Sequence, residues 1–244
     1  MNMPIDPEQG STGGGAVVTF TGTGLSGATA VHFGSEPATI TANTATSVSV
    51  VSPSGAGVVE ATVTTPGGTS NPVPYYYVPP PFVLDASPAS GPTAGGSTVT
   101  ITGRGLAATT SVRFGESAVT PTVVSDSELT VVTPAVAAGT VPLVVTGHGG
   151  TVALSFEFVT PPAVTGFSPV TGTTEGGTLV DLTGTALSTT TGVTFGGIAA
   201  TSFAVLSDTR IAAVTPAHSS GEVTVAVTTT GGTDAAPGTF LYVP

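Results

Sequence analysis

The sequence contains no cysteine, no tryptophan and no lysine, and only 7% of its 244 residues are charged. Without cysteine there is no disulfide framework, no thiolate zinc site, no thiol nucleophile and no cysteine-ligated iron–sulfur cluster. Three basic residues against fourteen acidic ones give a formal net charge of −11. Binding to a nucleic-acid backbone needs clustered lysine and arginine. The composition therefore excludes thiolate chemistry and predicts no nucleic-acid partner.

Long apolar runs are also missing. No stretch reaches the roughly 18–20 apolar residues that cross a bilayer, so we expect no membrane span. The first seven residues lack both the basic and the apolar region of a secretory signal peptide. An extracellular, cell-surface or particle-associated location without a recognisable signal peptide is our expectation, and the export route stays open.

Glycine (34 residues) and proline (21 residues) are abundant, and most of the rest alternates valine, isoleucine and threonine with small polar residues. β-branched residues favour strands, so the composition predicts an all-β protein. A Phe-Gly pair recurs at a spacing of 81, at Phe33-Gly34, Phe114-Gly115 and Phe195-Gly196. Five other markers keep a spacing of 81 or 82. The chain is therefore expected to be three tandem copies of one unit.

The expected domains are residues 1–79, 80–160 and 161–244. Proline-rich joints separate them, at Pro79-Pro80-Pro81 and at Pro161-Pro162. Proline fixes φ and favours extended geometry, so these joints predict semi-rigid spacers and an extended row of domains.

Comparison of the three copies separates inward from outward positions. Val18 and Phe20 are apolar in every copy, whereas the residue between them is polar. This alternation is typical of a strand with one buried face. The same pattern assigns further inward positions, which in the first copy are Val31, Phe33, Val48, Val50, Val59, Ala61, Val63, Tyr75 and Tyr77. About seven short strands in each unit predict an immunoglobulin-like β-sandwich.

A longer motif runs through the middle copy. It reads Ser87-Pro88-Ala89-Ser90-Gly91, then Gly95-Gly96-Ser97-Thr98-Val99-Thr100-Ile101-Thr102-Gly103-Arg104-Gly105-Leu106, then Val112-Arg113-Phe114-Gly115, and later Thr133-Pro134 and Gly139-Thr140-Val141. Each copy thereby resembles the IPT/TIG domain, an immunoglobulin-like fold found in plexins, Rel-type transcription factors and many bacterial surface proteins. The copies depart mildly, with Asp6-Pro7 for Ser-Pro in the first and Ala186 for a glycine in the third.

The resemblance implies three IPT/TIG-type sandwiches in a protein of bacterial or phage type. Domains of this family are typically spacers, adhesion or interaction units, or appendages to carbohydrate-active enzymes. The motif residues are structural, so the resemblance carries the fold further than the function.

Candidate catalytic and metal-binding residues are few. His32, His148 and His218 fall on a strand, in a turn and in a loop, and the repeat does not bring them together. Asp126 with Glu128, or Glu116 with Glu157, are the carboxylate pairs that would suit glycoside hydrolysis; the residues 126–128 make too short a cluster for calcium. Acidic residues do not recur at one position in all three copies. We expect no catalytic residue, no metal site and no cofactor, and we do not expect an enzyme.

One aromatic residue is a candidate for an interaction. In the run Tyr75-Tyr76-Tyr77 the outer two residues share the inward face, so Tyr76 is expected to point outward beside the first joint. Its sister positions are Glu157 and Leu241. An exposed tyrosine can stack on a sugar or pack at a protein interface, and both interpretations stay open.

The low charge leaves a surface made mainly of threonine, serine, alanine and glycine, which lose little side-chain entropy on contact. These features favour a non-catalytic structural or interaction protein, namely a rigid multi-domain spacer or a subunit of a surface or particle assembly such as a fibre, filament or decoration. Its partners would be other proteins or further copies of itself. The alternative is a carbohydrate-binding or adhesion module with a glycan partner.

Overall fold

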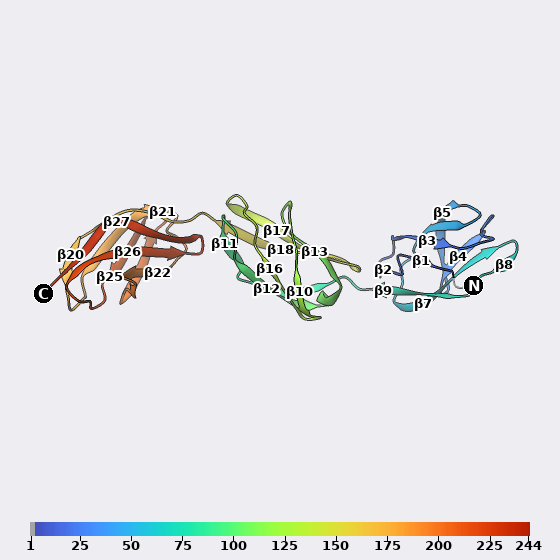
Figure 1. Ribbon diagram of the computed structural model, residues 1–244, viewed down its shortest axis with the longest axis horizontal. Helices are drawn as coiled ribbons and strands as arrows, with labels where there is room; N and C mark the ends of the chain where they lie inside the picture. The colour runs from blue at the N-terminus through green and yellow to red at the C-terminus, as the bar shows by residue number, and fades with distance from the viewer. Residues whose placement is uncertain (1–2) are drawn as a thin grey trace. The chain divides into compact units, whose positions relative to one another are not determined.

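The computed structural model describes residues 3–244 (Figure 1). Nearly all of its regular structure is strand. The described residues contain no α-helix and a single short 3-10 helix, η1 (Leu106–Ala108). The predicted all-β fold is therefore confirmed.

The first group of strands forms two sheets that share one strand. Its members are β1 (Ile5–Asp6), β2 (Gln9–Ser11), β3 (Val17–Thr21), β4 (Ala30–Phe33), β5 (Glu36–Asn43), β6 (Ser47–Val51), β7 (Gly57–Thr65), β8 (Gly68–Thr69) and β9 (Val73–Val78). Their order is β1-β3-β6-β5-β4-β7-β9-β2, with β8 beside β7. β5 pairs first with β4 and then with β6, so it passes from one sheet to the other. We call this group the first sandwich.

The second group forms two separate sheets, and we call it the middle sandwich. Its strands are β10 (Phe82–Ser87), β11 (Ser90–Pro92), β12 (Thr98–Arg104), β13 (Thr109–Phe114), β14 (Ser117–Val119), β15 (Thr122–Ser125), β16 (Glu128–Val132), β17 (Gly139–Gly147) and β18 (Gly150–Val159). The sheet orders are β10-β12-β16-β15 and β11-β18-β17-β13-β14.

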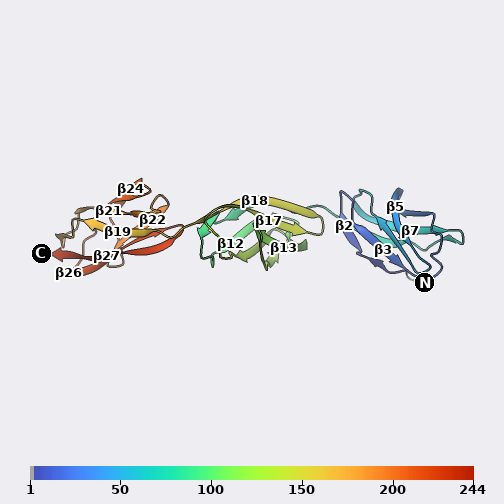
Figure 2. The same ribbon diagram turned by 90° about the horizontal axis from the view of Figure 1, so that it is seen from above.

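The third group repeats that plan, and we call it the third sandwich. Its strands are β19 (Ala163–Ser168), β20 (Thr171–Thr173), β21 (Leu179–Thr185), β22 (Thr190–Phe195), β23 (Ile198–Ala199), β24 (Ser202–Ser207), β25 (Arg210–Val214), β26 (Gly221–Thr229) and β27 (Gly232–Val243). The sheet orders are β19-β21-β25-β24 and β20-β27-β26-β22-β23. Strands β21, β22 and β24 are marked in Figure 2.

Each sandwich has nine strands where the sequence predicts about seven. One extra strand arises because a proline interrupts the opening strand. In the first sandwich Pro7 separates β1, which pairs with β3, from β2, which pairs in parallel with β9. Proline lacks the N–H that a ladder needs, so the strand changes sheet at this residue. A second extra strand in the middle and third sandwiches comes from division of the counterpart of β5.

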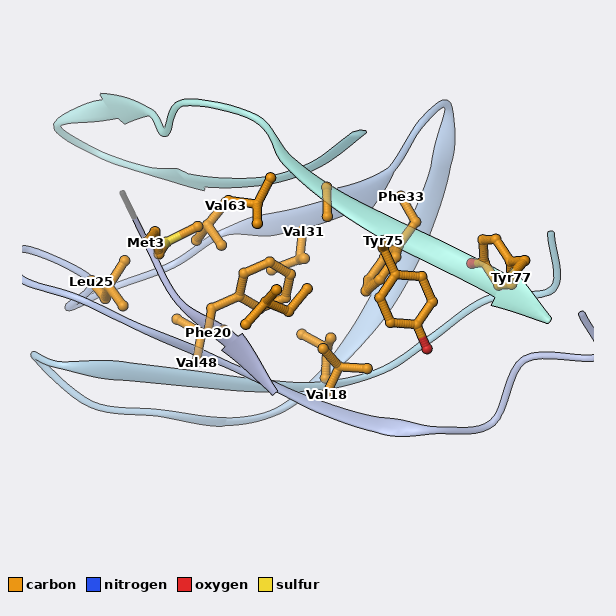
Figure 3. Packing of buried hydrophobic residues seen from close by; sticks show 14 residues of the cluster. Met3, Val18, Phe20, Leu25, Val31, Phe33, Val48, Val63, Tyr75 and Tyr77 are labelled. Atoms are coloured by element: carbon orange, nitrogen blue, oxygen red, sulfur yellow. The ribbon is translucent and has the colours of Figure 1, made fainter. Parts of the chain in front are cut away.

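The cores consist of the inward-facing residues that the sequence alternation predicts. In the first sandwich Val18, Phe20, Phe33 and Tyr75 are at most 2% exposed. Figure 3 shows these side chains gathered between the two sheets. The third sandwich buries the matching residues, among them Val180, Leu182, Phe195, Ile211 and Phe240. Val59, near the start of β7, is the exception in the first sandwich, because it is only half-buried.

The chain divides into two compact units. One comprises Met1–Ala86, Thr100–Val131 and Leu143–Leu154; the other comprises Ser87–Val99, Val132–Pro142 and Ser155–Pro244. The first sandwich lies within the former unit and the third sandwich within the latter. The middle sandwich contributes strands to both.

Candidate interaction surfaces

An aromatic face lies on the outer side of the first sandwich. Tyr76 on β9 stands opposite Val58 on β7 and, in parallel register, opposite Gln9 on β2. Tyr76 is 45% exposed and Val58 is 60% exposed, whereas Tyr75 and Tyr77 on the same strand are buried. Hydrogen bonding on both sides of β9 holds this pair on a rigid surface. Tyr76 therefore points outward, as the alternation predicts.

The other two sandwiches lack this pair of an exposed aromatic and an exposed aliphatic residue. In the third sandwich the matching positions are Leu241 and Glu222, which also stand opposite each other. The Glu222 carboxylate accepts a hydrogen bond of 3.1 Å from the Thr239 hydroxyl. In the middle sandwich the matching residue is the exposed Glu157. An aromatic–aliphatic face at this place is thus particular to the first sandwich.

A second apolar surface lies along one edge of the third sandwich. All six residues of β24 are exposed, and Phe203, Val205 and Leu206 have 38%, 38% and 56% of their surface accessible. Ile198 on β23, at the edge of the facing sheet, is 46% exposed. Sequence reasoning missed this surface. Its signals were the uncharged run from residue 182 to residue 207 and one extra residue between Phe195 and Ile211.

The matching edge of the first sandwich is more polar. The second half of β5 presents Thr39, Thr41 and Asn43 to solvent, and its single large aliphatic residue, Ile40, is half-buried. The middle sandwich is intermediate, because β15 exposes Val123 and Val124 between Thr122 and Ser125.

The three histidines lie in separate places. His32 is on β4, opposite Pro37 and Thr62. His148 is exposed in the turn between β17 and β18. The His218 ring stacks on Tyr242 with the centroids 5.0 Å apart and the planes at 20°. His218 is thus a packing residue of the third sandwich.

Two aspartates accept hydrogen bonds from the backbone amides of turns. Asp126 was a candidate in the sequence analysis, and its counterpart Asp208 was not. Asp126 accepts a hydrogen bond of 3.1 Å from the Gly105 amide. Its counterpart Asp208 accepts hydrogen bonds from the amides of Ser188 and Ala186. Hydrogen bonding lowers the pKa of Asp208. The Ser188 side chain contributes most, and the backbone amides of Ser188 and Ala186 lower the pKa further. The first sandwich has Ala45 at this position, and there the Asn43 side chain accepts from the Ala28 amide and donates to the Leu25 carbonyl.

The remaining carboxylate candidates are on the surface. Glu116 lies 3.6 Å from the Arg113 guanidinium in the turn after β13. Glu157 lies on β18, opposite Ser90. Asp181, which was not among the candidates, forms a 2.7 Å ion pair with Arg210 across β21 and β25. Among residues 3–244, no group of three or more histidine and carboxylate side chains is arranged to hold a metal ion.

The part of the chain that the structure describes has no helix long and apolar enough to cross a membrane. Comparison of the sequence with curated proteins finds no match. Among solved structures, the extracellular region of plexin A4 is 21% identical over 89% of this chain, with a TM-score of 0.46. This chain covers 21% of that one.

Two further similar structures are of bacterial proteins. SGBP-B of a Bacteroides ovatus mixed-linkage glucan utilization locus, solved with a mixed-linkage heptasaccharide, is 19% identical over 93% of this chain and 60% of its own, with a TM-score of 0.33. Invasin, a bacterial integrin-binding protein, is 14% identical over 100% of this chain and 60% of its own, with a TM-score of 0.25.

The family comparison covers most of the sequence. The model of the IPT/TIG domain matches residues 3–77, 81–159 and 162–242. These ranges correspond to the first, middle and third sandwiches in turn, and two of them end one residue before the end of the last strand. The chain belongs to the IPT/TIG family and carries three tandem immunoglobulin-like domains of it.

Proposed function

We propose that this protein is a non-catalytic spacer and a subunit of a surface or particle assembly. The three sandwiches would hold two ends at a fixed separation, and exposed strand edges would contact other subunits. IPT/TIG domains are interaction and structural modules, which agrees with this role. The observation that carries the proposal is a packing contact repeated at both joints.

At each joint the chain packs against a glycine in the last hairpin turn of the next sandwich. A Cβ added to Gly149 would overlap the Pro79 carbonyl, and a Cβ added to Gly231 would overlap the Thr160 carbonyl. Pro79 and Thr160 hold matching positions in the two joints. Such close backbone contact, together with the fixed φ of the neighbouring prolines, restricts the joints. This restriction supports a spacer more than a flexible tether.

Small-angle X-ray scattering of the full chain at low concentration tests the spacer role. We expect the elongated profile of three domains in a row. A variant with Pro79, Pro80 and Pro81 all replaced by glycine should give a broader distribution of distances. If the native chain is as compact or as variable as the triple variant, the spacer role is wrong.

The glycine contacts offer a finer test by point substitution. Gly231→Ala should loosen the second joint, because the added methyl collides with the Thr160 carbonyl. The matched control is Gly67→Ala in the first sandwich, where the nearest atom to an added Cβ is the Thr65 hydroxyl oxygen at 3.6 Å. Hydrogen exchange of the segment around residue 160 should rise in the first variant. Equal exchange in both variants would contradict the role given to this contact.

A second candidate function is carbohydrate binding at the face formed by Tyr76, Val58 and Gln9. An exposed ring beside a polar amide on a rigid sheet suits stacking on a sugar. A polysaccharide pull-down with the native chain and with Tyr76→Ala tests it. Loss of retention in Tyr76→Ala, with Leu241→Ala unchanged as the control in the third sandwich, would favour the glycan role over the spacer role alone.

A further inference from the structure

The outer edge of β24 is a terminal strand edge of the third sandwich. β24 pairs with β25 on one side and is the last strand of its sheet. Figure 2 shows it at the margin of the sandwich. Its Phe203 and Val205 stand opposite the buried Ala213 and Ile211, yet each keeps 38% of its surface exposed. Apolar side chains and unpaired backbone groups therefore occur together along this edge.

Edge strands are usually guarded by lysine, proline or inward charges, because their free N–H and C=O groups can pair with another strand. β24 contains neither proline nor charge, and no charged residue occurs between Asp181 and Asp208. Its one protective feature is a bulge between Val205 and Ser207. The edge therefore suits pairing with an additional strand.

We propose that β24 pairs antiparallel with β24 of a second copy of this chain. This proposal rests on the assembly role proposed above, to which it assigns a surface. A two-fold axis at Ala204 would place Ala204 opposite its own copy and Phe203 opposite Val205 of the second copy. Opposed residues of antiparallel strands lie on the same face, so the apolar side chains would cover one another.

Charge favours a second copy as the occupant. Two chains of net charge −11 repel one another over most of their surfaces. The run from residue 182 to residue 207 is uncharged, so contact along β24 brings no carboxylates face to face. In the register about Ala204, the nearest acidic residue, Asp208, would stand near Ala200 of the second copy. A basic partner, in contrast, would find no charge to recognise on this edge.

The first sandwich provides a matched position for a control. Ala42 stands opposite Ser49 on β6, and Ala204 stands opposite Ala212 on β25. Ser49 and Ala212 occupy the same place in the repeat, one residue after the buried Val48 and Ile211. Both alanines are exposed. The neighbours of Ala42 along the strand, Thr41 and Asn43, are polar and exposed. Pairing at this edge would bury no apolar side chain from them, so we expect no strand pairing there.

Disulfide trapping tests the register, because the chain has no cysteine of its own. Directly opposed residues in an antiparallel pair have Cα atoms about 4.5–5.5 Å apart, within the roughly 4.4–6.8 Å that a disulfide spans. Mild oxidation of Ala204→Cys should give a covalent dimer at least tenfold faster than oxidation of Ala42→Cys. Equal rates would overturn the proposed pairing.

Substitution by lysine tests the same edge without cross-linking. One strand pair with few apolar side chains is a small interface, so we expect a weak dimer seen by sedimentation at micromolar concentration and above. Ala204→Lys should raise the dimer dissociation constant at least tenfold, because two lysines would face each other. Ala42→Lys should change it less than twofold. Unchanged melting of both variants would confirm that they fold.

The outcomes separate this proposal from the spacer role. A native chain that stays monomeric at all concentrations overturns the β24 pairing, whereas its scattering profile still tests the spacer role independently. A native chain that dimerises equally with and without Ala204→Lys also overturns the pairing but leaves the assembly role standing.

Discussion

The first and third sandwiches have nearly the same core but different edges. Phe33 meets Tyr75 edge to face at 4.8 Å, and Phe195 meets Phe240 in the same way at 5.4 Å. At the edge, however, β5 is one continuous strand with polar exposed residues, whereas β23 and β24 are divided and apolar. The residues between the sheets determine the fold, and the edge is free to take on a different role in each domain.

The strongest test of a shared core is truncation of its central phenylalanine. Phe33 is 2% exposed and Phe195 is 0% exposed. Removal of a buried phenylalanine side chain costs about 3–5 kcal/mol. We expect Phe33→Ala and Phe195→Ala to lower the stability of their own sandwich by this amount, measured in the full chain by hydrogen exchange in denaturant. Phe203→Ala on the β24 edge is the control and should cost less than either; an equal cost would mean that the edge belongs to the core.

Alkaline pH should separate the first sandwich from the third. Burial, with smaller contributions from Tyr75 and Glu36, raises the pKa of Tyr77 to about 12. Burial also raises the pKa of Tyr75 and of Tyr242. The third sandwich has Phe240 in place of Tyr75, so Tyr242 is its one core tyrosine, whereas the first sandwich has two.

Because the folded pKa of Tyr77 lies above the unfolded value near 10, its contribution is complete below pH 10 and is lost as the pH rises toward 12. Two pKa units correspond to about 3 kcal/mol. Denaturant unfolding at pH 8 and pH 11 should show a larger loss for the first sandwich than for the third. Tyr77→Phe should reduce that loss. An unchanged loss in this variant would exclude Tyr77 as its source.

The turn after β3 and the matching turn after β21 should give smaller changes in stability, of opposite sign in the two sandwiches. Gly24 in the first sandwich has a φ of 73°, and the matching Ala186 in the third has a φ of 55°. The left-handed region costs a residue with a Cβ about 1–2 kcal/mol. Ala186→Gly should therefore stabilise the third sandwich by about 1 kcal/mol, and Gly24→Ala should destabilise the first by a similar amount. Thermal melting of both variants checks this, and shifts of the same sign would contradict the explanation.

Much of this architecture could be predicted from the sequence, because alternation with a period of two is a direct consequence of a half-buried strand. Val18 and Phe20 illustrate it, and the repeat removes doubt about which positions stay apolar. Pairing along the edge could not be predicted in the same way. Residues 36–43 remain one strand, whereas residues 198–207 divide into two. The middle sandwich divides the same segment without an extra residue, so the division depends on how the segment contacts two different sheets. The outward direction of Tyr76 followed from alternation, but the partnership of Tyr76 with Val58 needed the register of β7 and β9.

The smallest expected difference between the two cores concerns one hydroxyl group. Tyr75 is fully buried, and its neighbour Ser52 offsets only part of the rise that burial causes in its pKa. The contact with Ser52 falls short of hydrogen-bond geometry, so within the described residues the Tyr75 hydroxyl has no hydrogen-bond partner. The middle and third sandwiches have phenylalanine at this position, Phe156 and Phe240.

An unpaired buried hydroxyl costs free energy, and the space left by its removal is small. Tyr75→Phe should therefore leave the first sandwich unchanged or stabilise it by up to about 1 kcal/mol. Tyr77→Phe is the matched comparison, since the Tyr77 hydroxyl donates a hydrogen bond of 2.9 Å to the Pro53 carbonyl. At neutral pH that variant should lose about 1 kcal/mol. Denaturant unfolding of the two variants measures the difference, and a destabilised Tyr75→Phe would mean that an ordered water or Ser52 satisfies the Tyr75 hydroxyl in solution.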